Sequence, residues 1–173
     1  MDVDQTGRIL RVDTEGEHET DLVGRALAEI IRPGTVLGVT GPLGAGKTRL
    51  ARALAVALGV PEELVSSPTY VLMQEYPGKI PFWHLDAYRL RGPEQFEALG
   101  VSELWDEPVG LVYVEWAELV LDALPPQTWR LRIESTGPES RRWTFDFPVE
   151  RGNDPASRLA DLLRAPNTRA SRA

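Results

Sequence analysis

The stretch TVLGVTGPLGAGKTRLARALAVALG, residues 35–59, decides the fold because it joins three patterns in one segment. It opens with the short apolar run TVLGV, bounded by glycines, which is typical of a buried β-strand. Residues 47–59, rich in Ala and Leu and closed by Gly59, predict a helix. Between them GPLGAGKT, residues 41–48, matches G-x-x-x-x-G-K-[ST] in the strand–loop–helix context that this motif requires. An ordinary glycine-rich turn is the competing interpretation, and this context disfavours it.

The motif predicts a loop that cradles nucleotide phosphates. Its glycines permit backbone angles that turn successive N–H groups toward phosphate oxygens, and the positive end of the following helix favours the same charge. We expect Lys47 to reach the β and γ phosphates and Thr48 to supply a hydroxyl to Mg²⁺. The residues expected to contact the nucleotide here are Gly41, Leu43, Gly44, Ala45, Gly46, Lys47, Thr48 and Arg49.

Helix and strand patterns alternate through the first two-thirds of the chain, which indicates an α/β fold. A strand pattern over residues 8–12 precedes an amphipathic helix that ends before Pro33. Further strands are predicted in YVLMQEY (70–76), IPFWHLD (80–86), GLVYVEWAEL (110–119), TWRLRIES (128–135) and RRWTFDF (141–147). The later strands alternate apolar and polar residues. We therefore expect a single P-loop NTPase-like domain whose mixed central sheet has flanking helices and an antiparallel edge.

The end of the chain carries a different pattern. Residues 1–150 are assigned to the P-loop domain and residues 151–173 to a C-terminal extension. One short helix is predicted near residues 155–163. The last ten residues are mostly small and polar and are expected to form a flexible tail.

Composition restricts the possible chemistry. The chain has no cysteine, which excludes disulfides, thiolate metal sites and thiol nucleophiles. Its two histidines, His18 and His84, are far apart in sequence, so a histidine-rich metal site has little support, whereas Mg²⁺ with oxygen ligands remains open. The net charge of -7 disfavours broad binding to nucleic acid. Because no apolar run approaches the roughly 18 residues of a membrane span, we expect a cytoplasmic protein without membrane association.

Two carboxylates stand at the ends of predicted strands, where open α/β sheets bind their ligands. Glu115 follows the apolar run LVYV and is the expected second Mg²⁺ ligand beside Thr48; a solvated strand-end carboxylate is the alternative. Asp86 ends the strand IPFWHLD and is expected to accept a hydrogen bond from the attacking water. Arg89 either neutralises phosphate charge or forms a structural ion pair with Asp86.

Two further residues, Thr69 and Trp116, have two interpretations each, and His84 has one simpler interpretation. Thr69, in SSPTY, is a candidate for sensing the γ-phosphate, as a threonine does in GTPases, or part of an ordinary turn. Trp116 is either core packing or a ring near the nucleotide. His84 shares a strand face with Asp86, and a satisfied buried histidine is the simpler interpretation.

In this order and spacing GPLGAGKT, SSPTYVL, WHLDAYRL, ALG and VYVEWAE resemble the TsaE family, small P-loop ATPases of bacterial tRNA threonylcarbamoyladenosine synthesis. The similarity covers roughly residues 17–142. Two positions depart from the family pattern: Pro42, where an acidic residue is common, and Arg49, where Thr or Ser is common. Neither position supplies an obligatory phosphate ligand.

The resemblance implies that residues 41–48 bind ATP, and that Thr48 and Glu115 hold Mg²⁺. It also implies functional roles for Thr69, Asp86 and Trp116, and it names TsaD and TsaB as partners. In that family TsaD transfers the threonylcarbamoyl group to adenosine in tRNA. A chain of this kind hydrolyses ATP to support the cycle and meets tRNA only indirectly.

Two other functions stay open at this point. A small-molecule P-loop kinase shares the loop and the fold class but needs an acceptor pocket and usually a lid rich in arginine. A non-hydrolysing assembly switch uses ATP only to control partner binding. The presence of both Asp86 and Glu115 favours hydrolysis over such a switch.

Overall fold

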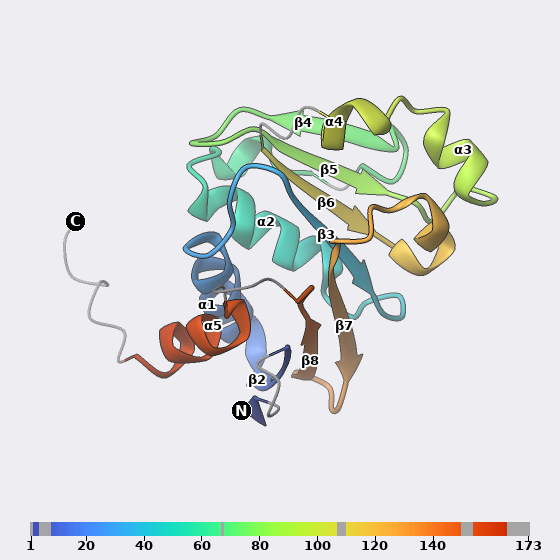
Figure 1. The fold of residues 1–173 in the computed structure, drawn as a ribbon. Helices are drawn as coiled ribbons and strands as arrows, with labels where there is room; N and C mark the ends of the chain where they lie inside the picture. Colours follow the sequence, from blue (N-terminus) through green and yellow to red (C-terminus); the bar gives the residue numbers. More distant parts are fainter. Residues whose placement is uncertain (1, 4–7, 67, 107–109, 150–153, 166–173) are drawn as a thin grey trace.

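The predicted strand–loop–helix unit lies at the centre of the molecule. The computed structural model describes residues 2–3, 8–66, 68–106, 110–149 and 154–165. In it, the strand–loop–helix unit consists of β3 (Thr35–Thr40) and α2 (Lys47–Ala57), joined by the P-loop. β3 is buried on both faces, because helical segments cover each side of the sheet around it (Figure 1). α2 is amphipathic and buries Leu50, Ala51 and Leu54 against the sheet. The α/β class and the position of the P-loop are confirmed.

The described residues form one eight-stranded mixed sheet in the order β1-β2-β8-β7-β3-β6-β5-β4. Its four central strands β7, β3, β6 and β5 are parallel, and antiparallel pairs extend it on both sides, so the predicted antiparallel edge is confirmed. The other strands are β1 (Asp2–Val3), β2 (Ile9–Glu15), β4 (Met73–Tyr76), β5 (Phe82–Asp86), β6 (Leu111–Glu115), β7 (Trp129–Ser135) and β8 (Ser140–Asp146).

Helices divide between the two faces of this sheet. α1 (Gly16–Ala28), α2 and α5 (Pro155–Arg164) pack on one face in one large apolar cluster. The short helix α3 (Pro93–Glu97) and the 3-10 turns η2 (Ala117–Leu119) and η3 (Leu121–Ala123) cover the other face over β5 and β6. α4 (Ser102–Asp106) packs there through Trp105, whose ring lies 6.3 Å from that of Phe96. The 3-10 turn η1 (Glu62–Leu64) follows α2.

The predicted C-terminal helix is present as α5 and lies beside α1 (Figure 1). Leu159 and Ala160 are fully buried in the same cluster as α1 and α2, so this helix shares the core of the P-loop domain. Asp154 caps it by accepting a hydrogen bond from the backbone N–H of Ser157 at 2.9 Å. The tail predicted beyond this helix falls on residues 166–173, outside the described part of the chain.

Two predicted strands are too long. The pattern GLVYVEWAEL predicts a strand up to residue 119, but β6 ends at Glu115, because Trp116 has a left-handed φ of 58° and residues 117–119 form η2. The pattern YVLMQEY predicts a strand from residue 70, but β4 begins at Met73. The N–H groups of Val71 and Leu72 both donate to the carbonyl of Pro68, at 3.0 and 2.6 Å, so the chain forms a turn there instead. Leu72 has a φ of 66°, which no strand tolerates. Within the described residues no helix is long and apolar enough to cross a membrane.

Gly24 sets the distance between α1 and α2. A Cβ at this position would lie 2.5 Å from the Cβ of Ala53 and 3.1 Å from its backbone carbonyl carbon. We therefore expect Gly24→Ala to lower the free energy of unfolding by about 1–3 kcal/mol, although alanine favours helix by about 1 kcal/mol. Urea unfolding followed by circular dichroism measures this, with the exposed neighbour Arg25→Ala as control. Equal stability of Gly24→Ala and the unmodified chain would contradict the close helix contact.

Candidate nucleotide-binding site

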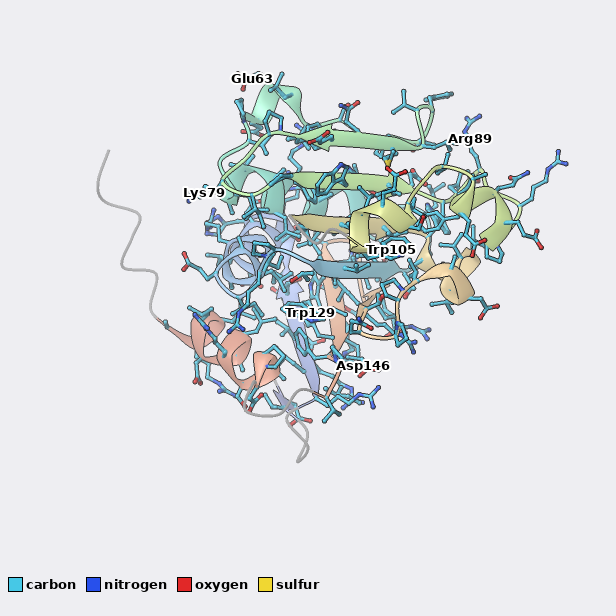
Figure 2. All side chains as sticks on the ribbon, turned by 45° about the horizontal axis from the view of Figure 1, so that its top comes forward. Glu63, Lys79, Arg89, Trp105, Trp129 and Asp146 are labelled. Atoms are coloured by element: carbon cyan, nitrogen blue, oxygen red, sulfur yellow. The ribbon has the colours of Figure 1, made fainter. Side chains whose placement is uncertain are left out.

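A cavity of about 670 Å³ lies at the carboxyl ends of the central parallel strands. The P-loop, the start of α1, the ends of β5 and β6 and the β7–β8 hairpin form its walls. In Figure 2, Lys79, which precedes β5, and Arg89, which follows it, mark the two ends of that strand, and the cavity lies toward the Arg89 end. The predicted site residues that line it are Leu43, Gly44, Ala45, Gly46, Lys47, Thr48, Arg49, Thr69, Asp86, Glu115 and Trp116.

Gly41 begins the loop and rests against the sheet rather than lining the cavity. Its φ is 144°, and a Cβ there would lie 2.4 Å from the carbonyl oxygen of Ile133 on β7. Only glycine permits this approach, which brings the loop directly onto the end of the sheet. Gly44 and Gly46 also have positive φ values, 76° and 109°, so the backbone between them curls around the cavity.

The ammonium group of Lys47 lies inside the curve of this loop. Its Nζ donates hydrogen bonds to the carbonyls of Gly41 at 2.7 Å and Pro42 at 3.0 Å, and it lies 3.6 Å from the centre of the Trp116 ring. The residue is only 4% exposed. Burial lowers the pKa of Lys47, and the negative charge of Glu115 opposes that shift. A cation shielded from water in this way attracts an anion strongly.

Glu115 and Thr48, the predicted Mg²⁺ ligands, are in contact. Thr48 Oγ1 donates to Glu115 Oε2 at 3.0 Å, and the other carboxylate oxygen, Oε1, lies 2.7 Å from His84 Nε2. Glu115 is 2% exposed, so the alternative of a solvated strand-end carboxylate is wrong. Tyr113, on the same strand, donates its hydroxyl to the carbonyl of Lys47 at 2.7 Å. The end of β6 therefore contacts the first turn of α2 at two points.

This donor set fits Mg²⁺ together with a polyphosphate. A hydroxyl and a carboxylate are hard oxygen ligands, and Mg²⁺ in proteins commonly takes one or two carboxylates and completes its shell with water and phosphate oxygens. In the described part of the chain no three His, Asp or Glu side chains gather into an all-protein cage. The nearby Lys47 ammonium and the glycine-lined curve supply the positive side that phosphate requires.

Asp86 lies next to Glu115 in the register of β5 and β6 and is 3% exposed. Its Oδ2 accepts a hydrogen bond from Thr69 Oγ1 at 2.5 Å, and its Oδ1 accepts the backbone N–H of Tyr88 at 2.9 Å. The predicted alternative of an Asp86–Arg89 ion pair is wrong, because the Arg89 guanidinium lies 4.4 Å from the centre of the exposed Tyr70 ring. Thr69 and Asp86 thus form one unit at the cavity wall.

Trp116 follows β6 directly and has a left-handed φ of 58°. This turn directs the chain away from the sheet, and the partly exposed ring meets Tyr88 at 4.9 Å between centres while covering Lys47. The ring also packs at the edge of the smaller apolar cluster. Trp116 therefore lines the cavity and contributes to packing at once. Tyr88, which the sequence analysis did not select, forms the same wall.

The guanidinium of Arg49 binds acidic side chains of α1. Its Nη1 donates to Glu17 at 2.7 Å, and its Nε and Nη2 donate to Asp21 Oδ1 at 3.1 Å and Oδ2 at 2.8 Å. The hydrogen bond to Asp21 raises the pKa of Arg49. The structure therefore places this predicted nucleotide contact at the border of the cavity, bound to α1 rather than directed into the loop.

Arg141 ties the P-loop to the β7–β8 hairpin, a role that the sequence analysis did not identify. Its Nε donates to the carbonyl of Ala45 at 3.1 Å and its Nη2 to that of Gly44 at 3.4 Å. Its Nη1 donates to the carbonyls of Ser140 at 2.8 Å and Gly137 at 3.2 Å, which hold the guanidinium on the hairpin. One side chain thus contacts two successive carbonyls of the loop.

We expect Arg141→Ala to accelerate amide hydrogen exchange across residues 43–46 by about tenfold, because a charged hydrogen-bond donor contributes about 1.5–3 kcal/mol. Exchange followed by mass spectrometry measures this. Its neighbour Arg142 is the matched control: it pairs with Asp13 at 2.7 Å, away from the loop. Unchanged exchange in Arg141→Ala, or equal acceleration in Arg142→Ala, would contradict the assigned contact.

The strand, glycine-rich loop and helix, with carboxylates at the ends of two neighbouring strands, define a P-loop protein of the α/β class. A sequence model of the family described as threonylcarbamoyl adenosine biosynthesis protein TsaE matches residues 14–143. The chain belongs to the TsaE family.

Individual relatives agree with this assignment. The chain is 35% identical to the tRNA threonylcarbamoyladenosine biosynthesis protein TsaE of Bacillus subtilis, over 79% of this chain and 84% of that protein. It is 44% identical to the protein of the same name from Synechocystis, over 62% of this chain and 69% of that protein. The crystal structure of Bacillus subtilis YdiB superposes with a TM-score of 0.69 at 28% identity, covering 90% of this chain and 94% of that one.

Proposed function

We propose that this protein is a Mg²⁺-dependent ATPase that supports tRNA threonylcarbamoyladenosine modification together with TsaD and TsaB. Membership of the TsaE family supports the connection to this modification. The observation that carries the ATPase proposal is the arrangement of Lys47, Thr48, Glu115 and Asp86 around one cavity beside a glycine-rich loop. The same proposal assigns the protein to the cytoplasm and gives it only indirect contact with tRNA.

Each residue has a distinct part in the proposal. Backbone N–H groups of the P-loop and the Lys47 ammonium bind the phosphates, and Thr48 and Glu115 hold Mg²⁺, which when bound neutralises charge on the phosphate oxygens. Asp86, with Thr69 on one oxygen, orients the attacking water by accepting its hydrogen bond. In this proposal Lys47, Thr48 and Glu115 hold the nucleotide and its metal ion, and Asp86 with Thr69 acts on the attacking water.

A kinase is a weaker proposal for this geometry. Kinases of this class bring arginines from a lid onto the phosphates, whereas Arg49 and Arg141, which line the cavity, are bound to α1 and to backbone carbonyls. A nucleotide-dependent assembly switch remains the second candidate, because both oxygens of Asp86 already accept hydrogen bonds from the protein. Turnover measurements decide between the switch and the ATPase.

The first of two predictions from this proposal separates ATP binding from ATP hydrolysis. Lys47→Ala is expected to weaken ATP binding strongly, because it removes the cation inside the loop. Asp86→Asn is expected to keep ATP affinity within about threefold of wild type while lowering turnover by about 100-fold or more, since a group that orients water acts mainly in the transition state. Calorimetry measures the ATP affinity, and a phosphate-release assay measures the turnover. Equal losses of binding and turnover in Asp86→Asn would assign this residue to binding or folding instead.

The second prediction concerns the partners. Turnover is expected to be slow for the isolated protein and to rise on addition of TsaD and TsaB. Arg49 and Arg141, which line the cavity, bind Asp21 and the carbonyl of Ala45, so a partner is expected to supply the missing positive charge. Phosphate release with and without the pair measures this, with Glu115→Ala as the inactive control. Turnover that is the same with and without the pair would contradict partner stimulation. ATP binding without turnover in every mixture would favour the assembly switch.

A further inference from the structure

A buried histidine lies directly behind the proposed Mg²⁺ ligand. His84, on β5, has no exposed surface, and its Nε2 lies 2.7 Å from Glu115 Oε1 on the neighbouring strand. This is the only side-chain hydrogen bond of the imidazole among the described residues, because Nδ1 is buried without a partner. Among the described residues, the imidazole therefore forms its one side-chain hydrogen bond with Glu115.

Because Nδ1 has no hydrogen-bond partner, the surroundings of the ring also indicate which nitrogen carries the proton. A proton on Nδ1 would be a buried donor without an acceptor, which costs about 1–3 kcal/mol. With the proton on Nε2, the ring donates to Glu115 Oε1 and leaves only a lone pair unmatched. Nε2–H to Oε1 is thus the arrangement that the surroundings of the ring favour.

Packing holds the imidazole in this orientation. The Phe82 ring stacks against it at 6.0 Å between centres and 16° between planes, and Tyr113 meets it edge-on at 5.4 Å. Both aromatic residues are fully buried. A ring fixed on two sides presents its N–H in one direction, so the position of Glu115 Oε1 is fixed as well.

The hydrogen bond to Oε1 of Glu115 also determines where the other carboxylate oxygen, Oε2, points. With Oε1 held by His84, Oε2 faces Thr48 Oγ1 at 3.0 Å, which is the pair proposed to hold Mg²⁺. Without the imidazole donor, Glu115 would retain one hydrogen bond and gain freedom about its side-chain torsions, and a buried carboxylate oxygen would lose its partner.

We propose that His84 is a positioning residue that orients Glu115 for Mg²⁺ through its Nε2–H. The inference rests on the proposed function, since it assumes that Thr48 and Glu115 hold the metal. It assigns His84 no contact with the nucleotide and no part in proton transfer.

The test uses three variants of the full chain. His84→Leu removes the donor at similar volume, and His84→Gln returns an N–H at about the same reach. Val112→Ala, on β6 but directed to the opposite face of the sheet, is the control for a general loss of core packing. Thermal unfolding by circular dichroism establishes that each variant is folded. Calorimetry then gives the affinity for a non-hydrolysable ATP analogue in EDTA and over a Mg²⁺ titration.

We expect His84→Leu to raise by about tenfold the Mg²⁺ concentration that gives half of the Mg²⁺-dependent gain in analogue affinity. This is the lower end of the loss that is typical when a residue orienting a metal ligand is removed. Its affinity for the analogue in EDTA should remain at the wild-type value. His84→Gln should recover most of the Mg²⁺ response, and Val112→Ala should keep the wild-type midpoint despite a lower melting temperature.

Three results would overturn the inference: a wild-type Mg²⁺ midpoint in folded His84→Leu, an equal loss of analogue binding in EDTA, or a Gln variant as impaired as the Leu variant. If His84→Leu does not fold, a Gln variant with a wild-type midpoint supports the assigned donor and an impaired one contradicts it. A wild-type protein whose analogue affinity does not respond to Mg²⁺ would instead contradict the proposed function itself.

Discussion

The site depends on the register of three parallel strands. β3, β6 and β5 are paired so that Val39, Glu115 and Asp86 lie side by side across the sheet. The chain leaves β3 at this level and curls into the P-loop, while the neighbouring strands present carboxylates at the same level. A shift of one residue in either pairing would turn one carboxylate to the opposite face of the sheet, because side chains alternate along a strand. The hydrogen bonds between strands therefore set the distances among groups that lie far apart in sequence.

Side chains of β6 connect this sheet to the helix above it. The Tyr113 hydroxyl bonds the carbonyl of Lys47, and Glu115 accepts the Thr48 hydroxyl, so the first turn of α2 is held at two successive positions. On the other side of the loop, Arg141 holds backbone carbonyls from the hairpin. The loop is thus restrained from the sheet, from the helix and from the hairpin, which is how a segment rich in glycine keeps one shape.

The sequence alone was sufficient for the features carried by local patterns. The strand–loop–helix unit, the position of Glu115 and Asp86 at strand ends, and helix α5 all follow from periodicity and capping within short segments. Arg141 could not be assigned this way, because its contact with Ala45 spans 96 positions and depends on the hairpin folding over the loop. The turn at residues 70–72 was missed because its apolar residues match a strand pattern, although Pro68 begins a turn there. The roles given to the site residues remain predictions that await the experiments above.

The ammonium of Lys47 has acceptors of its own before any anion arrives. Because it bonds the carbonyls of Gly41 and Pro42 and lies beneath Trp116, an entering phosphate competes with groups that already satisfy the cation. The affinity of the loop is then a difference between two sets of hydrogen bonds and not the full strength of one. Under the proposed function, each binding event exchanges the carbonyl contacts of Lys47 for phosphate contacts, and each release restores them.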